Sequence, residues 1–275
     1  MAFLGYHQDS APAPMAFAPD MRGTLAQTGA LPHHGFLLRF FPVFDLQRHG
    51  VAALFCSPTY DAADAIHGHR AFPDFSAAQW TQIDCAILDH ALDFAATLAR
   101  HGIVAAVGAS VGFATLSDPR GRIAYREALR AAHAREQPYL VIKIEDIPEH
   151  ATAKRIGELV ASLRLVAPRV WAHLPGSRIL LGGHEPLHAS GLVMSMPAKL
   201  PFHGMQSEAR WLARQATLQT ALSCMDQVDS AAELETVHAA GVRFVAGQAI
   251  GRPALAASAM PDDIRDVLYT ERPLR

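Results

Sequence analysis

A lysine within an apolar run is the first residue in this sequence that could carry chemistry. Lys143 lies between Ile142 and Ile144 in the segment VIKIED. A lysine that points into a cavity could form a Schiff base, as in a lyase. The simpler interpretation is an ion pair with Glu145 or Asp146, or a side chain that reaches solvent along its stem. We favour the simpler interpretation, because buried lysines with a pKa suited to catalysis are uncommon.

The segment HEPLH matches the His-Glu-x-x-His pattern of zinc peptidases with His184, Glu185 and His188. That mechanism needs both histidines on one face of a helix, four residues apart. Two glycines precede the segment and Pro186 lies inside it, which disfavours a continuous helix. We therefore expect a loop that exposes two histidines.

Two further groups of polar residues have a simple structural interpretation. Asp61, Asp64, His67 and His69 follow Pro58 and could hold a metal, but aspartates at these positions also suit helix starts, so we expect a loop. The basic stretch with Arg120, Arg122, Arg126 and Arg130 lacks interleaved aromatic residues that could stack on nucleotides. We interpret it as the solvated face of a helix.

Composition excludes several classes of function. The formal charge of −2 and the pI near 6.7 provide no overall attraction to nucleic acid or to anionic lipid. Cys56, Cys85 and Cys224 have no metal-site spacing and are typical of reduced thiols. The sequence contains no run of 18 apolar residues and does not begin with the pattern of a signal peptide. We expect a cytoplasmic protein that binds neither nucleic acid nor membrane.

Apolar runs alternate with helical stretches from Gly35 onward, and the chain of 275 residues is long enough for one α/β barrel. We expect strands at Phe36–Val43, Val51–Phe55, Ile103–Val107, Tyr139–Ile144, Val170–Ala172, Arg178–Leu181, Leu192–Met196 and Val242–Ala246, with a short one before Asp226. Helices are expected at Gln79–His101, Arg122–Arg135, Ala151–Val166, Ser207–Leu222 and Ser230–Ala240. The number of repeats, without a glycine-rich dinucleotide turn, favours a TIM-like (β/α)8 barrel.

Two segments resemble the EAL domain family. Leu37–Leu54, with the sequence LLRFFPVFDLQRHGVAAL, is similar to the opening strand and turn of EAL domains. Val228–Pro253, with the sequence VDSAAELETVHAAGVRFVAGQAIGRP, is similar to their closing segment. The resemblance covers roughly residues 35 to 255. It implies an EAL-type barrel at 34–258, with an N-terminal tail or arm at 1–33 and a C-terminal helix and tail at 259–275.

The resemblance implies an enzyme that hydrolyses cyclic di-GMP with two divalent cations, held by carboxylates and an Asn at the strand ends. The family pattern E-A-L-x-R reads Ala52-Ala53-Leu54-Phe55-Cys56 here, so the metal carboxylate becomes Ala52 and the phosphate-binding Arg becomes Cys56. The Asn of the third strand falls at Gly108, and the Glu of the fourth strand falls on Lys143.

The remaining positions of the family site continue this pattern. The paired Asp residues of the fifth strand fall near Ala172 and His173, and the K-I-D strand reads Met194-Ser195-Met196. At the last acidic position of the family site, Asp226 is the acidic residue that remains. The Gln near the end of the family pattern falls on Ala246. The degenerate positions are Ala52, Cys56, Gly108, Lys143, His173, Met194, Asp226 and Ala246. Apolar or cationic residues cannot replace the oxygen ligands of hard cations.

We therefore expect a catalytically inactive EAL-like signalling protein without a cofactor, which acts by binding an unidentified protein partner. Tight binding of cyclic di-GMP is not expected, because the phosphate-binding Arg is also lost. Whether the chain forms a homo-oligomer is left open. The alternatives are a residual cyclic-di-GMP phosphodiesterase, a sensor that binds the dinucleotide without cleaving it, and a lyase based on Lys143.

Overall fold

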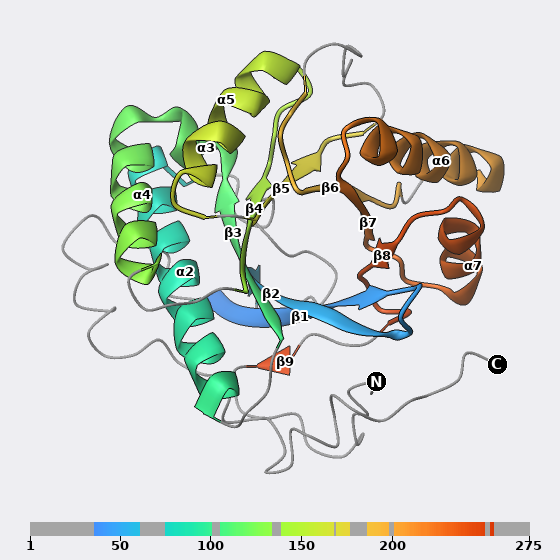
Figure 1. Ribbon diagram of the computed structural model, residues 1–275, viewed down its shortest axis with the longest axis horizontal. Coiled ribbons are helices and arrows are strands. Elements are labelled where there is room, and N and C mark those ends of the chain that lie inside the picture. The colour runs from blue at the N-terminus through green and yellow to red at the C-terminus, as the bar shows by residue number, and fades with distance from the viewer. Residues whose placement is uncertain are drawn as a thin grey trace.

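One sheet forms the centre of the molecule in the computed structural model, which describes residues 36–60, 75–100, 105–133, 139–167, 169–176, 186–197, 201–250 and 254–255. The strands are β1 (Phe36–Asp45), β2 (Gly50–Tyr60), β3 (Ala106–Gly112), β4 (Leu140–Glu145), β5 (Arg169–Leu174), β6 (Gly191–Ser195), β7 (Leu222–Asp226), β8 (Phe244–Val245) and β9 (Ala254–Leu255). The helices are α2 (Ala77–Arg100), α3 (Phe113–Ser117), α4 (Pro119–His133), α5 (Ala153–Arg164), α6 (Phe202–Leu218) and α7 (Ala231–Ala239). Figure 1 shows them around the strands.

The strands close into a ring, which confirms the predicted barrel. Their order is β2-β3-β4-β5-β6-β7-β8-β1-β9, and an additional pairing joins β1 to β2. Strands β2 to β8 pair in parallel, whereas β1 is antiparallel to β2 and to β8. The prediction of a parallel sheet is therefore wrong for β1. The connection between Asp45 and Gly50 is too short for a crossover, so it makes a hairpin.

A buried carboxylate holds both this hairpin and the closing seam between β1 and β8. Asp45 Oδ1 accepts hydrogen bonds from the backbone N–H groups of Gln47 and Arg48 at 2.9 and 3.2 Å. Its Oδ2 is 3.1 Å from Arg243 Nη2. Only two residue pairs join β1 to β8, Phe44 with Val245 and Asp45 with Phe244. The ion pair thus reinforces a seam that is as short as the pairing between β7 and β8, which also has two residue pairs.

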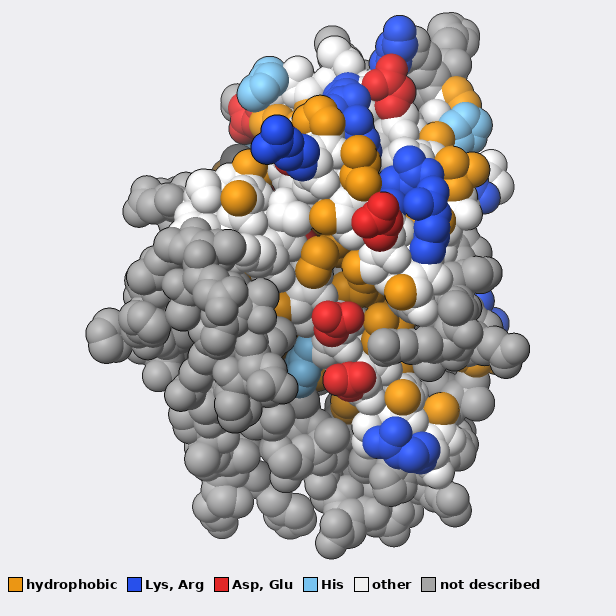
Figure 2. Space-filling model, turned by 90° about the vertical axis from the view of Figure 1, so that its left-hand side faces the viewer, with side chains coloured by type: hydrophobic (Ala, Val, Ile, Leu, Met, Phe, Trp, Pro, Cys, Tyr) orange, Lys and Arg blue, Asp and Glu red, His pale blue; other side chains and the backbone are white. Residues whose placement is uncertain are grey.

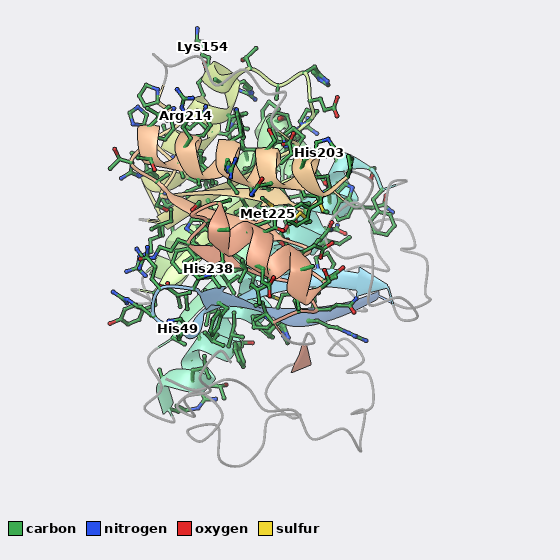
Figure 3. All side chains as sticks on the ribbon, turned by 90° about the vertical axis from the view of Figure 1, so that its right-hand side faces the viewer. His49, Lys154, His203, Arg214, Met225 and His238 are labelled. Carbon is green, nitrogen blue, oxygen red and sulfur yellow. The ribbon has the colours of Figure 1, made fainter. Side chains whose placement is uncertain are left out.

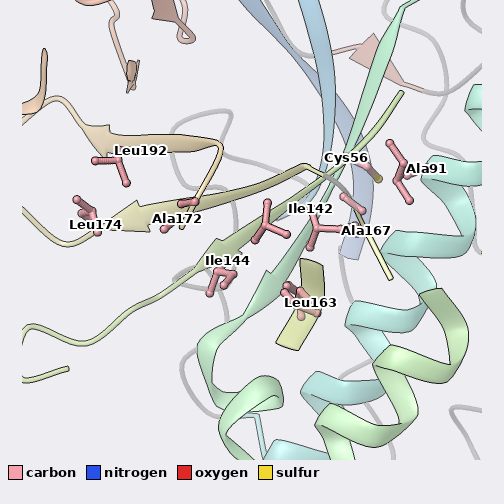
Figure 4. Close-up of a cluster of buried hydrophobic side chains, with 14 of the residues drawn as sticks. Cys56, Ala91, Ile142, Ile144, Leu163, Ala167, Ala172, Leu174 and Leu192 are labelled. Atoms are coloured by element: carbon pink, nitrogen blue, oxygen red, sulfur yellow. The ribbon is translucent and has the colours of Figure 1, made fainter. Parts of the chain in front are cut away.

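Alternation along the strands separates two apolar layers. An inner core inside the ring contains Val43, Ala53, Phe55, Val141, Trp171, Val193, Cys224, Phe244 and Ala246. An outer core between ring and helices takes the neighbouring residues, such as Leu54, Cys56, Ile142 and Met194. Part of this outer core is shown in Figure 4. Because both faces of each strand are covered, the strands are apolar on both sides, as the sequence indicated.

The helices bury one apolar face against the ring. In α2, the apolar residues Ile83, Ile87, Leu88, Leu92 and Leu98 recur at three- and four-residue spacing and are buried. Helix α7 begins with a capping box, in which the Ser230 hydroxyl accepts from the Glu233 backbone N–H and the Glu233 carboxylate accepts from the Ser230 backbone N–H. None of the described helices is long and apolar enough to span a membrane.

Several predicted boundaries differ from the structure. Helix α6 ends at Leu218, and Leu222 instead begins the short strand β7 that was expected before Asp226. Strand β3 starts at Ala106 and continues to Gly112, past the predicted end at Val107, since small residues here still pair with β4. The predicted strand Arg178–Leu181 and the predicted termini at 1–33 and 259–275 lie outside the described residues.

The pH dependence of stability should respond to His90. This ring stacks on Phe40 with centroids 5.5 Å apart, and its buried Nε2 has no hydrogen-bond partner among the described residues. Burial lowers the pKa of His90 from 6.5, and Asp93 offsets that effect only in part. The unfolded chain therefore binds a proton at His90 more readily than the folded protein does. The free energy of unfolding decreases as the pH falls through the ordinary histidine pKa of 6.5 and below it. His90→Gln should flatten the decline of Tm between about pH 7.5 and pH 5.5. The exposed His150, changed to Gln, is the matched control; an equal slope in both variants would contradict the assignment.

Candidate functional site

The carboxyl ends of the parallel strands form one end of the ring, which we call the mouth. Active sites of α/β barrels lie at this end. Five polar residues reach it from different strands: Ser57 of β2, Glu145 of β4, His173 of β5, Ser195 of β6 and Asp226 of β7. Chemistry is therefore expected here if the chain performs any.

A buried lysine with two carboxylates is the strongest electrostatic feature of the mouth. Lys143 Nζ lies 2.6 Å from Glu145 Oε1 and 4.0 Å from Asp226 Oδ2. The three side chains are only 7%, 6% and 8% exposed. Lys143 and Glu145 lie two residues apart on β4 and so share a face, whereas Asp226 approaches from β7. The lysine therefore links two separate walls of the ring.

These carboxylates keep the lysine charged. Burial alone would lower the pKa of Lys143, but Glu145 and Asp226 outweigh it, and the pKa is raised above its ordinary value. A Schiff-base lysine must lose its proton to attack a carbonyl, so this environment works against a lyase. The predicted ion pair with Glu145 is confirmed. The sequence offered Asp146 only as an alternative to Glu145, and the second carboxylate near Lys143 is Asp226.

Aromatic side chains fill the ring beneath the ion pair. The rings of Phe55 and Trp171 have centroids 5.3 Å apart, and those of Trp171 and Phe244 lie 5.8 Å apart. Lys143 Nζ is 5.0 Å from the Phe55 centroid, within the range of a cation–π contact. The space left between these groups is about 10 Å³, enough for a single water molecule at most. The interior of the ring is thus a packed core.

Two glycines make room for this aromatic filling. A Cβ atom added to Gly108 would lie 2.2 Å from Phe55 Cδ1, and one added to Gly191 would lie 2.6 Å from Trp171 Cδ1. Gly108 is on β3 next to Phe55 of β2, and Gly191 is on β6 next to Trp171 of β5. The Asn that the family resemblance places at Gly108 could not fit beside Phe55 in this arrangement.

Some of the predicted site residues meet inside the ring. Lys143, Asp226 and Ala246 line the same small cavity. His173 Nε2 is 3.0 Å from Ser195 Oγ, in a hydrogen bond between β5 and β6. The half-buried Ala52 packs against the inner core.

Two other predicted positions face away from the interior. Cys56 and Met194 belong to the outer core, and Figure 4 shows Cys56 near Ala91 of α2. A β-bulge in β2 explains why Cys56 faces outward. Val43 pairs with Ala53 but Phe44 pairs with Val51, so Ala52 is an extra residue in the strand. Beyond it, Ala53, Phe55 and Ser57 face inward. Ser57 Oγ lies 3.3 Å from Ser110 Oγ and takes the interior place predicted for Cys56.

The described residues of the mouth supply few oxygen ligands for a pair of divalent cations. Such cations need six or more oxygen ligands, several of them from carboxylates. Glu145 and Asp226 both face the Lys143 ammonium, and the described residues contain no group of three or more His, Cys, Asp or Glu that could hold a metal. Cys224 nearby is no alternative ligand, because burial raises the pKa of its thiol strongly.

The other candidate groups lie away from the mouth or outside the described residues. His184 and Glu185 of HEPLH are outside them, while Pro186–His188 is not helical, as expected of a loop. The run with Asp61, Asp64, His67 and His69 is also outside.

Burial raises the pKa of Cys85 to about 11, so this thiol stays protonated at neutral pH.

Glu145, Phe55 and Trp171 contribute to the mouth but were not predicted as site residues. The signal for Glu145 was its position two residues after Lys143 on a strand, which puts both side chains on one face. Nothing in the sequence indicated that Trp171 would face Gly191. That contact depends on the register between β5 and β6.

Comparison with known proteins shows similarity in structure only. No family model and no curated protein sequence matches the chain. The EAL domain of Xanthomonas citri FimX, solved in complex with c-di-GMP, aligns with a TM-score of 0.61 and 20% identity, over 86% of this chain and 92% of that domain. The Bacillus subtilis YkuI protein, which has an EAL domain and was solved with c-di-GMP and calcium, gives 0.63 and 16%, over 84% and 58%. Klebsiella pneumoniae BlrP1, in a manganese and c-di-GMP complex, gives 0.59 and 14%, over 82% and 58%. The chain thus has the barrel fold of EAL proteins, as predicted.

Replacing Gly108 should test the packed interior. Gly108→Ala should destabilise the protein by about 1–3 kcal/mol, because its Cβ would collide with the Phe55 ring. Gly157→Ala in α5 is the matched control, since its Cβ would be 3.6 Å from Pro186 O, an ordinary contact. The control should be neutral or stabilising by roughly 0.5–1 kcal/mol. Denaturant unfolding measures both.

A double variant makes the test specific to the contact with Phe55. Phe55→Leu added to Gly108→Ala should cost less than the sum of the two single changes, since the smaller side chain relieves the collision. Additive losses would show that Phe55 does not occupy the space beside Gly108.

Proposed function

We propose that this chain is a non-catalytic signalling protein with an EAL-type barrel, which acts by contact with another protein and has lost cyclic-di-GMP hydrolysis. The observation that carries the proposal is the Lys143 ammonium between Glu145 and Asp226 in the mouth. The other positions of the family site hold mostly apolar or small residues, namely Ala52, Cys56, Gly108, Met194 and Ala246.

The chemistry of phosphodiester cleavage supports the loss of activity. Metal ions activate the attacking water and neutralise the charge that builds up on the phosphate oxygens. A fixed ammonium does neither for an incoming substrate here, because its charge is already opposed by two carboxylates at 2.6 and 4.0 Å. The position of the phosphate-binding Arg holds Cys56, and its inward-facing neighbour is Ser57, neither of which supplies a cation.

The interior also offers little room for a dinucleotide deep in the ring. Phe55, Trp171 and Phe244 occupy the space beneath the ion pair, and the residual cavity is about the size of one water. A ligand would have to lie above Lys143, next to an excess of carboxylate charge. Two phosphates carry negative charge themselves, so such a pose is electrostatically unfavourable.

Helix α4 carries the surface that best suits a protein partner. Arg120, Ile123, Glu127 and Arg130 are exposed along one side of α4, and Ile123 is 58% exposed. Arginine together with exposed apolar side chains is common in the centre of protein interfaces. Figure 2 shows the side of the molecule with α2 and α4, where basic side chains gather among hydrophobic and acidic ones. The predicted N-terminal tail or arm at 1–33, a second candidate for partner contact, lies outside the described residues.

The loss of catalysis predicts the behaviour of the purified protein with cyclic di-GMP. With magnesium or manganese in excess, no linear dinucleotide should form, and calorimetry should show no heat at high micromolar ligand. Metal-dependent turnover that Asp226→Asn abolishes would contradict the proposal. Heat without turnover would instead support a dinucleotide sensor.

The protein-contact part of the proposal predicts a charge-dependent interaction through α4. Arg120→Glu together with Arg130→Glu should weaken partner capture from the native cell by at least about tenfold if the helix lies at the interface centre. The control is the same double reversal on α6, Arg210→Glu with Arg214→Glu; both of these residues are exposed, and Figure 3 labels Arg214. Equal capture by both variants would exclude α4 as the docking surface.

A further inference from the structure

We propose that the Lys143 ammonium is the resident cation of the mouth, and that replacing it with a neutral or acidic side chain would open a site for one hard divalent cation. This inference rests on the proposed loss of metal-dependent catalysis and gives that loss a structural cause. It concerns a site that the native chain has closed.

The geometry shows that the ammonium bridges walls that would otherwise repel each other. Glu145 is at the end of β4 and Asp226 is at the end of β7, with β5 and β6 between them in the ring. Lys143 Nζ lies within 2.6 and 4.0 Å of their oxygens. One positive group thus serves carboxylates from separate strands, which is the arrangement by which a bound metal joins parts of a site.

Burial makes that bridging charge strongly stabilising. All three side chains are less than a tenth exposed, and carboxylates in such surroundings are costly unless a cation or hydrogen-bond donors compensate them. If the ammonium is removed, Glu145 and Asp226 lose a close positive charge. The structure then favours either uptake of a proton or entry of another cation.

The groups around Lys143 determine which cation would enter. Glu145 and Asp226 offer carboxylate oxygens, and Ser57 of the same cavity offers a hydroxyl. Oxygen donors select magnesium, manganese or calcium over softer metals. Cys224 also lines the cavity, but its buried thiol holds its proton and does not compete.

The size of the side chain explains why the native protein should exclude such an ion. Lysine fills the space between the two carboxylates and lies above the Phe55 ring at 5.0 Å. The free space beside it admits no more than one water. A divalent ion can therefore enter only when the lysine stem and its charge are both removed or replaced. A glutamate at position 143 would remove the charge and add two oxygen ligands.

The test compares four full-length proteins by manganese binding, followed by electron paramagnetic resonance of the free ion, and by thermal unfolding. These are the wild type, Lys143→Glu, Lys143→Met, and Lys154→Glu as a control at an exposed lysine of α5 that Figure 3 labels. Saturating manganese should raise the Tm of Lys143→Glu by roughly 5–10 °C. Lys143→Met should gain a smaller rise, and the other two proteins should gain none.

Each outcome decides the proposal. A Lys143→Glu protein that folds only when manganese is present supports it as strongly as a shift in Tm. A Lys143→Glu protein that neither gains a shift nor folds with manganese overturns it. So does a wild type that binds manganese at the mouth, shown by loss of that binding in Asp226→Asn. The gain must also vanish in the double variant Lys143→Glu with Asp226→Asn, or the ion lies elsewhere and the proposal fails.

The same proteins separate this inference from the proposed function. If the wild type hydrolyses cyclic di-GMP with metal, the proposed function fails first. If the wild type is inactive but the Lys143 variants gain no manganese site, the proposed function stands and only the role of Lys143 as resident cation is wrong.

Discussion

Compensation of one buried charge constrains most of the barrel interior. The Lys143 ammonium lies in a region where an uncompensated charge would be prohibitive, so its two carboxylates must stay within a few ångströms. Glu145 meets that requirement from β4 itself, whereas Asp226 meets it only because the closed ring brings β7 toward the lysine. It also explains why this lysine is a structural cation: the groups that make its burial tolerable are the ones that hold its proton in place.

The aromatic filling and the ion pair depend on each other. Phe55 and Trp171 displace water from the space below Lys143, which strengthens every electrostatic contact there. They fit only because their neighbours on the adjacent strands, Gly108 and Gly191, have no side chain. The polar groups of the mouth therefore lie on top of a packed core, as they do in other α/β barrels.

The sequence was sufficient for the outlines of the fold and for the pair on β4, but insufficient for contacts set by register. Helix α7 could be predicted from Ser230 and Glu233 because its cap is local. The sequence offered Glu145 and Asp146 as partners of Lys143, and the period of a strand favours Glu145 because residues two apart share a face. The single extra residue Ala52 reversed the faces of β2 and moved Cys56 outward, an effect that no local pattern reveals. The approach of Asp226 to Lys143 joins residues 83 positions apart in the chain (226 − 143), and only the closed ring brings them together.

The seam between β1 and β8 has a consequence for how the chain reaches its native state. Asp45 pairs with Phe244 and forms its ion pair with Arg243, which lies 198 positions further along the chain. Only two residue pairs of the backbone accompany this ion pair between β1 and β8. Contacts of such long range carry a large loop-closure entropy and form late in folding. Intermediates in which β2 to β7 have assembled would therefore leave an open-edged sheet at this seam, and unpaired edges are the places where chains join one another wrongly. The ion pair of Asp45 with Arg243 stabilises the closed seam, and we expect it to shorten the lifetime of those aggregation-prone intermediates.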